Sequence, residues 1–154
     1  MYSRILVAVD GSATSDRALV HAVDLARESG AALRIAHVVD MGWASIAPEL
    51  AIDLHARVEA VRAEGRAVMD AALAIARDAG LQAESMTLET STPLQRVPEA
   101  IVDAAIEWRA DLLVLGTHGR KGVERLLLGS VADGVVRHSP IPVLLMPPHA
   151  SPAR

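Results

Sequence analysis

The chain has 154 residues, a length that suits one domain able to bury about two thirds of the surface of its unfolded form. Hydrophobic residues make up 51% of it, yet it contains no Phe, one Tyr and two Trp. The core must therefore be built from Ala, Val, Leu, Ile and Met, a composition that favours helices packed on a parallel sheet. The formal net charge of −4 and the shortage of aromatic side chains argue against nucleic acid as a partner. The absence of Cys excludes disulfides and thiol chemistry.

The N-terminus lacks the basic, apolar and small-residue order of a signal peptide, and no apolar run approaches the ~18 residues of a membrane span. We therefore expect a cytoplasmic protein that has no membrane segment. Residues 1–147 are expected to form the single domain, and residues 148–154 a short flexible C-terminal tail.

Apolar runs typical of strands alternate along the chain with helical patterns. Residues 5–9 are a continuous buried strand, and a helix over residues 15–29 follows, stopped by Gly30. In chain order, the remaining elements are a strand over 33–39, a loop over 40–49, a long helix whose apolar stripe runs from Leu54 to Ala79 and faces a sheet, a strand over 83–89, a helix over 98–109, a strand over 112–115, a helix over 130–138 and a strand over 143–146.

The order βαβαβαβαβ predicts an α/β fold: a single doubly wound, five-stranded parallel sheet with helices on both faces, because crossovers between parallel strands are right-handed. In such sheets the ligand lies beyond the carboxyl ends of the strands, where the winding reverses. With the strand order 3-2-1-4-5, that point lies between the first and fourth strands. The first strand ends in Asp10-Gly11-Ser12 and the fourth in Gly116, so two separate sequence signals meet at one crevice.

The stretch from Gly116 to Ser130 reads G-T-H-G-R-K-G-V-E-R-L-L-L-G-S and follows the fourth strand directly. A strand that opens into a glycine-rich basic loop and then a helix places backbone N–H groups around phosphate. Gly116 is expected to let the chain turn at the end of the strand. Gly119 is expected to adopt a positive φ or to let a ligand oxygen approach the backbone closely, and Gly129 to leave backbone N–H groups accessible at the start of the helix. Ser130 would cap that helix, with Asp133 completing a weak capping box. The alternative is a glycine-containing loop that holds no ligand.

Charged and polar residues around this loop have two interpretations each. The basic cluster of the loop could neutralise a polyphosphate, with Arg120 as the candidate, or be solvated surface; its members are His118, Arg120, Lys121 and Arg125. Asp10 could bind a ligand or simply turn the chain before Ser12.

The other histidines lack metal-ligand spacing, so no metal site is predicted; they are His21, His37, His55, His138 and His149. Met41 and Trp43 could flank a purine or pack under their loop.

Five stretches spread over nearly the whole chain carry a resemblance to a known family. They are R-I-L-V-A-V-D-G-S from Arg4 to Ser12, A-H-V-V from Ala36 to Val39, D-L-L-V-L-G-T-H-G-R from Asp111 to Arg120, L-L-L-G-S-V-A from Leu126 to Ala132, and S-P-I-P-V-L-L-M from Ser139 to Met146. In these stretches the chain resembles the universal stress protein family, specifically the ATP-binding branch that carries G-x2-G-x9-G-[ST]. Gly116, Gly119, Gly129 and Ser130 match that pattern in full.

The resemblance implies roles for particular residues. Asp10 would reach the adenosine part of ATP, Val38 would lie against adenine and hydrogen-bond it through its backbone, and Gly129 and Ser130 would hold phosphates. It also implies a homodimer formed through the last strand, residues 142–146. The chain departs from the family between residues 90 and 98, where T-S-T-P-L-Q-R-V-P replaces a short G-x-P element and leaves the shape of the pocket rim open.

Two classes of function follow. The first is a regulatory or stress-response protein that binds ATP, with Mg²⁺ or Mn²⁺ as candidate cations, and hydrolyses it little or not at all. The second is a slow ATPase or phosphotransferase, for which Asp10 and His118 are the nearby candidate groups, although neither stands in a hydrolytic motif. A third possibility is a dimerisation module whose pocket holds nothing.

Overall fold

The computed structural model describes residues 1–45, 53–90, 92, 94, 96–118 and 128–148. Its strands are β1 (Arg4–Ala8), β2 (Ala32–Asp40), β3 (Glu84–Thr90), β4 (Leu112–Gly116) and β5 (Val143–Met146). Its helices are α1 (Ala13–Ser29), the short 3₁₀ helix η1 (Gly42–Ser45), α2 (Leu54–Asp78), α3 (Val97–Glu107) and α4 (Ser130–His138). The α4 and β5 bounds are those predicted from the sequence, and the bounds of the other predicted elements differ by at most two residues at either end. The helix η1 falls in the predicted loop over residues 40–49.

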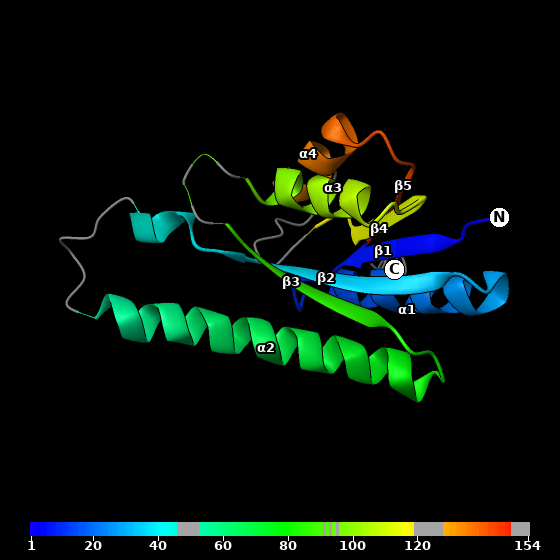
Figure 1. The fold of residues 1–154 in the computed structure, drawn as a ribbon, viewed down its shortest axis with the longest axis horizontal. Helices are drawn as coiled ribbons and strands as arrows, with labels where there is room; N and C mark the ends of the chain where they lie inside the picture. The colour runs from blue at the N-terminus through cyan, green and yellow to red at the C-terminus, as the bar shows by residue number, and fades with distance from the viewer. Residues whose placement is uncertain (46–52, 91, 93, 95, 119–127, 149–154) are drawn as a thin grey trace, which may run out of the picture.

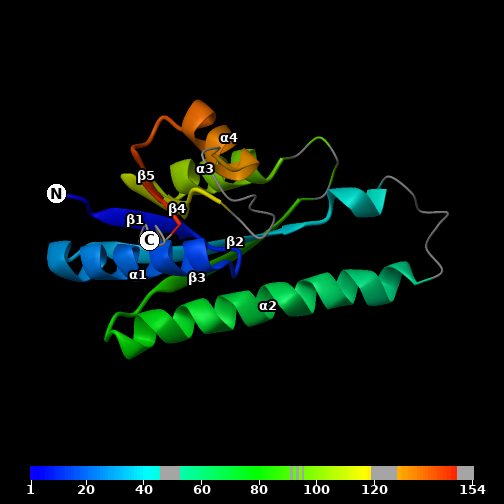
Figure 2. The same ribbon diagram turned by 180° about the vertical axis from the view of Figure 1, so that it is seen from behind.

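The five strands form one parallel sheet in the order β3-β2-β1-β4-β5. This arrangement confirms the predicted doubly wound α/β fold. Figure 1 shows α1 and α2 on one side of the sheet and α3 and α4 on the other, and the reverse view in Figure 2 shows the same two layers. The winding reverses between β1 and β4, which pair through Ile5 and Leu112 at their amino ends.

Side chains that alternate along the central strands divide between two hydrophobic cores. Ile5 and Val7 of β1 point into the core under α1 and α2, whereas Leu6 points into the core under α3 and α4. In β4, Val114 joins the first core and Leu113 the second. Helices contribute mainly small side chains, such as Ala18, Ala22 and Ala26 of α1, all fully buried. The aromatic-poor composition is therefore accommodated by alanine faces that lie close to the sheet.

Helix α1 starts two residues earlier than predicted because Ser12, not a later residue, is its N-cap. The Ser12 side chain accepts a hydrogen bond from the Ser15 N–H at 3.2 Å, the usual role of serine at this position. Helix α3 spans Val97–Glu107, and Arg109, which the sequence places in the helix, has φ 58°. The helix ends where this left-handed residue lets the Ala110 N–H donate to the Ala105 carbonyl.

The apolar stripe of α2 covers the sheet only along part of its length. Its buried residues are Gly65, Met69, Ala72 and Ala76, while Leu54, Val58 and Val61 near the amino end remain half-buried. The reason is length, because α2 has 25 residues and the longest strand has 9. Figure 1 shows α2 running along β3 and past its end. No helix in the described part of the chain is long and apolar enough to cross a membrane.

An exposed ion pair ties α2 to the edge strand β3. Arg62 Nε donates to Glu89 at 2.8 Å, and this guanidinium lowers the pKa of the Glu89 carboxyl. The pair therefore stabilises the fold at pH values above the ordinary pKa of a glutamate, and this contribution is lost as the pH falls through the lowered value. Both side chains are about 40% exposed, which keeps the effect small.

Helix α2 lies close to β2 at Gly65. A Cβ at this position would stand 2.9 Å from Val39 Cγ2 and 3.3 Å from His37 Cδ2. Neither neighbour yields easily: Val39 is β-branched and buried, and His37 Nδ1 donates to the Val9 carbonyl at 2.7 Å. Gly65→Ala should therefore destabilise the protein by up to about 2 kcal/mol, because overpacking costs about 1–3 kcal/mol and the gain in helix propensity offsets only about 1 kcal/mol of it. Urea unfolding measures the change.

Ala67, which is exposed on the same helix, provides the matched control. Ala67→Gly measures the propensity effect without the contact. If Gly65→Ala raised the free energy of unfolding by as much as Ala67→Gly lowers it, α2 would not be held close to β2 at this point.

Candidate functional site

Asp10 forms the turn that leaves β1. Its Oδ1 accepts a hydrogen bond from the Ser12 N–H at 2.9 Å, and its own N–H donates to Ser15 Oγ at 3.2 Å. These bonds make an Asx turn, which fixes the carboxylate at the carboxyl end of the strand. The turn-forming role weighed from the sequence is thus present. Asp10 is half-buried, and it makes these bonds to described residues through its Oδ1 and its N–H.

Gly116 brings the end of β4 against the first turn of α1. A Cβ on Gly116 would lie 2.8 Å from Thr14 Cγ2, 3.1 Å from the Thr14 carbonyl carbon and 3.2 Å from the Ser15 nitrogen. Gly116 is the last residue of β4 and has no positive φ, so the chain leaves the strand there without using the conformational freedom of glycine. Its function in the fold is close approach. Through Ser15, which bonds Asp10, the two predicted halves of the site come together.

Thr117 anchors the start of α4 to the end of the sheet. Its N–H donates to the Met146 carbonyl at 2.9 Å, and its carbonyl accepts the Gly129 N–H at 2.7 Å. The residue thereby joins β5, β4 and α4 at one point. Sequence reasoning assigned it no role, although it is the T of the G-T-H-G stretch and follows β4 directly.

Gly129, and not Ser130, is the N-cap of α4, which corrects the predicted cap. The helix has no side-chain capping bond, and Ser130 is its exposed first residue. The capping box is also wrong, because Asp133 accepts from Arg137 Nε at 2.8 Å instead. The backbone bond of Gly129 to Thr117 fixes the chain's entry to the helix, so no capping side chain is needed there. Among the described residues, no side chain accepts from the N–H groups of the first turn.

Gly129 is needed at this point for close approach. A Cβ there would stand 2.9 Å from the Thr117 carbonyl oxygen and 3.5 Å from His118 Cα. A substitution such as Gly129→Val would therefore push the start of α4 away from Thr117, so it would not separate an effect on phosphate binding from an effect on folding.

Val38 lies on β2, two residues past Ala36, which is the partner of the last residue of β1. β1 ends at Ala8, opposite Ala36, and the Val9 N–H donates to the Ala36 carbonyl at 2.9 Å. Because backbone groups in a strand change sides every residue, Val38 turns its N–H and carbonyl to the same side as Ala36. Its side chain packs against the α3 and α4 core. Val38 therefore presents backbone polar groups next to the turn at Asp10.

Met41 and Trp43 have packing contacts. Met41 is buried, and its N–H donates to Thr90 Oγ1 at 2.9 Å. The Thr90 hydroxyl donates in turn to Asp40 Oδ1 at 2.9 Å, which ties the ends of β2 and β3. The Arg57 guanidinium lies 4.9 Å from the centroid of the Trp43 ring. Sequence reasoning missed Thr90, a fully buried polar residue that no local pattern marks.

Part of the predicted basic loop is not described. Gly119, Arg120, Lys121 and Arg125 lie outside the described residues. His118 is described: its Nδ1 lies 2.9 Å from Thr117 Oγ1. Within the described ranges, no group of three or more His, Asp or Glu side chains could hold a metal ion.

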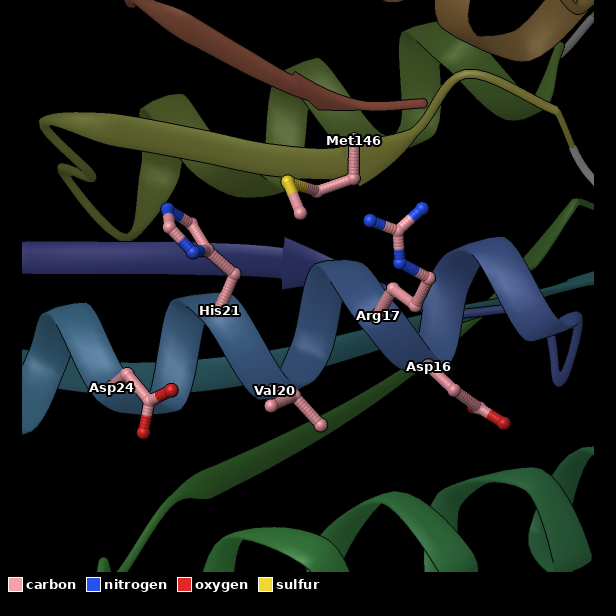
Figure 3. A pocket seen from close by; sticks show the side chains of 6 residues that line it. All are labelled: Asp16, Arg17, Val20, His21, Asp24 and Met146. Atoms are coloured by element: carbon pink, nitrogen blue, oxygen red, sulfur yellow. The ribbon is translucent and has the colours of Figure 1, made fainter. Parts of the chain in front are cut away.

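A surface groove of about 330 Å³ lies between α1 and the end of β5. Figure 3 shows its lining, in which α1 supplies all residues except one; the residues are Asp16, Arg17, Val20, His21, Asp24 and Met146. The Arg17 side chain donates to the Pro147 carbonyl. The groove is separate from the predicted site and belongs to the side of the molecule that carries the edge strand β5.

A parallel sheet wound in the order 3-2-1-4-5, with helices on both faces, defines a Rossmann-like α/β protein. The model of the universal stress protein family matches residues 1–147. The chain therefore belongs to the universal stress protein family.

Individual relatives agree with this assignment. The chain is 33% identical over 147 residues to a universal stress protein from Methanocaldococcus jannaschii, covering 95% of this chain and 82% of the relative. Among solved structures, it is similar to a universal stress protein in complex with cAMP, with 30% identity, a TM-score of 0.64 and coverage of 94% and 96% of the two chains. It is also similar to the universal stress protein from Archaeoglobus fulgidus in complex with dAMP, with 27% identity, a TM-score of 0.68 and coverage of 94% and 98%.

Proposed function

We propose that this universal stress protein binds ATP at the carboxyl ends of β1 and β4 and acts as a regulatory, stress-response homodimer with little or no hydrolysis. The observation that carries the proposal is the start of α4. This helix has no side-chain cap and is fixed to the end of β4 by the bond from the Gly129 N–H to the Thr117 carbonyl. The N–H groups at a helix N-terminus that is held in place and has no side-chain cap suit a phosphate group.

The nucleoside would lie next to the turn at Asp10. The Asp10 carboxylate is held by the Ser12 N–H at one oxygen, which leaves the other to accept from a ribose hydroxyl or base amino group. The backbone N–H and carbonyl of Val38 would pair with the adenine edge. Gly129 and Ser130 would hold phosphates, together with Gly116, Gly119 and Arg120 of the motif. Mg²⁺ or Mn²⁺, if it accompanies the triphosphate, would be held mainly by phosphate oxygens and water, as these ions are in many nucleotide sites.

Two similar proteins whose structures contain cAMP and dAMP support an adenine nucleotide as the ligand. Mass spectrometry of the ligand released from freshly purified protein would separate ATP from a monophosphate. We keep the domain limits of residues 1–147, the flexible tail of residues 148–154 and the cytoplasmic location as predictions from the sequence.

Ser130 allows the phosphate site to be tested without disturbing the fold. It is the exposed first residue of α4, where a carboxylate stabilises a helix by roughly 0.3–1 kcal/mol. Ser130→Glu should therefore leave the melting temperature unchanged or raised, yet weaken ATP binding by about tenfold or more, because its charge repels the phosphates. Calorimetric titration with ATP, AMP and adenosine measures the effect, which should be absent for adenosine.

Ser130→Gln is the matched control, since it has nearly the same shape and no charge. It should bind ATP clearly more tightly than Ser130→Glu does, because both variants lose the serine hydroxyl and only the glutamate adds a negative charge. Equal ATP affinity for Ser130→Glu and Ser130→Gln would place the phosphates away from the start of α4.

Hydrolysis should be slow. Asp10 is bonded through Oδ1 to the Ser12 N–H, a geometry that serves the turn, and binding that is not stronger in the transition state does not accelerate chemistry. In the presence of Mg²⁺ or Mn²⁺, we expect phosphate release well below ~1 s⁻¹, the lower end of ordinary enzyme rates. Multiple turnovers at or above that rate, abolished by Asp10→Ala or His118→Ala, would favour an ATPase.

The proposed dimer interface is the free edge of β5. Among the described strands, β5 pairs only with β4. Leu113 is opposite Val143 and donates to the Pro142 carbonyl at 2.9 Å. In a parallel ladder, the residue opposite such a donor turns its own N–H and carbonyl away. Val143 and Leu145 therefore present unpaired backbone groups to the open edge, which an identical strand can cover in a C2 dimer.

The groove beside this edge adds apolar surface to the proposed interface. Val20 is 48% exposed and faces the same groove as Met146. A partner that pairs with β5 would meet these side chains next, so the interface would extend from the strand onto α1.

Val143→Pro should abolish the dimer while keeping the sheet intact, because it removes an N–H that β4 does not use and proline is tolerated at a sheet edge. Light scattering at micromolar concentration should give a dimer mass for the unchanged protein and for the control Val143→Thr, and a monomer mass for Val143→Pro. A monomeric unchanged protein, or a dimeric Val143→Pro, would contradict the interface.

A further inference from the structure

We propose that His118 donates a hydrogen bond from Nε2 to a phosphate oxygen of the bound nucleotide, and that the Thr117 hydroxyl is the positioning group that keeps the proton on Nε2. This inference rests on the proposed nucleotide site and adds a residue that determines its preference for phosphorylated ligands.

The first observation is an unpaired buried nitrogen. His118 Nε2 is shielded from solvent and has no hydrogen-bond partner among the residues that the structure describes. Leaving a buried polar group unpaired destabilises a fold, and such groups are rare in folded proteins. A ligand atom at Nε2 would remove this cost, so the nitrogen is suited to binding.

The second observation is position. His118 follows Thr117, whose carbonyl accepts the N–H of Gly129, the N-cap of α4. A Cβ built on Gly129 would stand 3.5 Å from His118 Cα. His118 therefore lies beside the same uncapped helix start at which the phosphates are proposed to bind. A donor at this point complements the helix N–H groups, which also attract an anion.

The third observation concerns the other ring nitrogen. Nδ1 lies 2.9 Å from Thr117 Oγ1. When the hydroxyl donates to Nδ1, the neutral imidazole must carry its proton on Nε2, where it can be donated to an anionic oxygen. Thr117 is well placed to set this tautomer, because its backbone is held by bonds to Met146 and Gly129 on either side.

Two substitutions of His118 distinguish the contribution of Nε2 to ATP binding from that of Nδ1. A glutamine amide reaches about as far as Nε2, whereas an asparagine amide reaches only about as far as Nδ1. His118→Gln should keep ATP affinity within about threefold, and His118→Asn should lower it about tenfold, the loss expected for a hydrogen bond to a charged group. Neither variant should change affinity for adenosine, which has no phosphate.

Thr117 is tested by a matched pair as well. In ¹⁵N-detected spectra of the free protein, the unchanged His118 should show its proton on Nε2. Thr117→Val, which keeps the shape and removes the hydroxyl, should shift population to the Nδ1-protonated form and weaken ATP binding by about threefold. Thr117→Ser should restore both properties. A purely structural role of the hydroxyl would alter stability without changing the tautomer.

The outcomes distinguish this inference from the proposed function. If the unchanged protein bound ATP but His118→Gln and His118→Asn bound it equally well, the inference would be wrong and the nucleotide site would stand. A proton on Nδ1 in the unchanged protein, or an equal loss of affinity for adenosine, would also overturn it. Failure of the unchanged protein to bind any adenine nucleotide would overturn both. Circular dichroism and melting temperatures verify that each variant is folded.

Discussion

The contact between Gly116 and the first turn of α1 is the constraint on which the rest of the candidate site depends. Thr14 and Ser15 lie so close to Gly116 that a single added carbon would meet both. Because α1 is held there, Ser15 can bond Asp10 across the turn after β1. The carboxyl ends of β1 and β4 can then share one site. The topology places β1 and β4 side by side, and the contact at Gly116 brings their carboxyl ends close together. A larger residue at position 116 would push these two strand ends apart.

The start of α4 shows how a tertiary hydrogen bond can take the place of a side-chain cap. Many helices pair one of their first N–H groups with a capping side chain, whereas α4 has no such bond and begins at a glycine whose N–H donates to the Thr117 carbonyl. The position of the helix start is therefore set by the end of the sheet. The proposed phosphate site uses this same helix start.

Polar side chains near the strand ends have structural roles in addition to the proposed binding of a nucleotide. Asp10 closes a turn with Oδ1, and Thr90 joins Asp40 to the Met41 backbone. These bonds immobilise the backbone around the proposed nucleoside position before any ligand arrives, which reduces the entropy that binding must overcome. Pre-organisation of this kind agrees with the proposed binding of a nucleotide.

The sequence by itself determined the order of the elements, the parallel sheet and the two strand ends at which the site is proposed. Those features follow from local periodicity and from the fixed hand of βαβ crossovers, both of which can be read along the chain. Only the tertiary structure decided that Gly129 replaces Ser130 as the cap, that Gly116 serves close approach and that the amino-terminal part of the α2 stripe stays half-buried. Each of these depends on a neighbour far away in the sequence: Thr117 for Gly129, Thr14 for Gly116 and the limited length of the sheet for α2. Local patterns carry no information about such neighbours, because the same residues would cap, turn or pack differently on another scaffold.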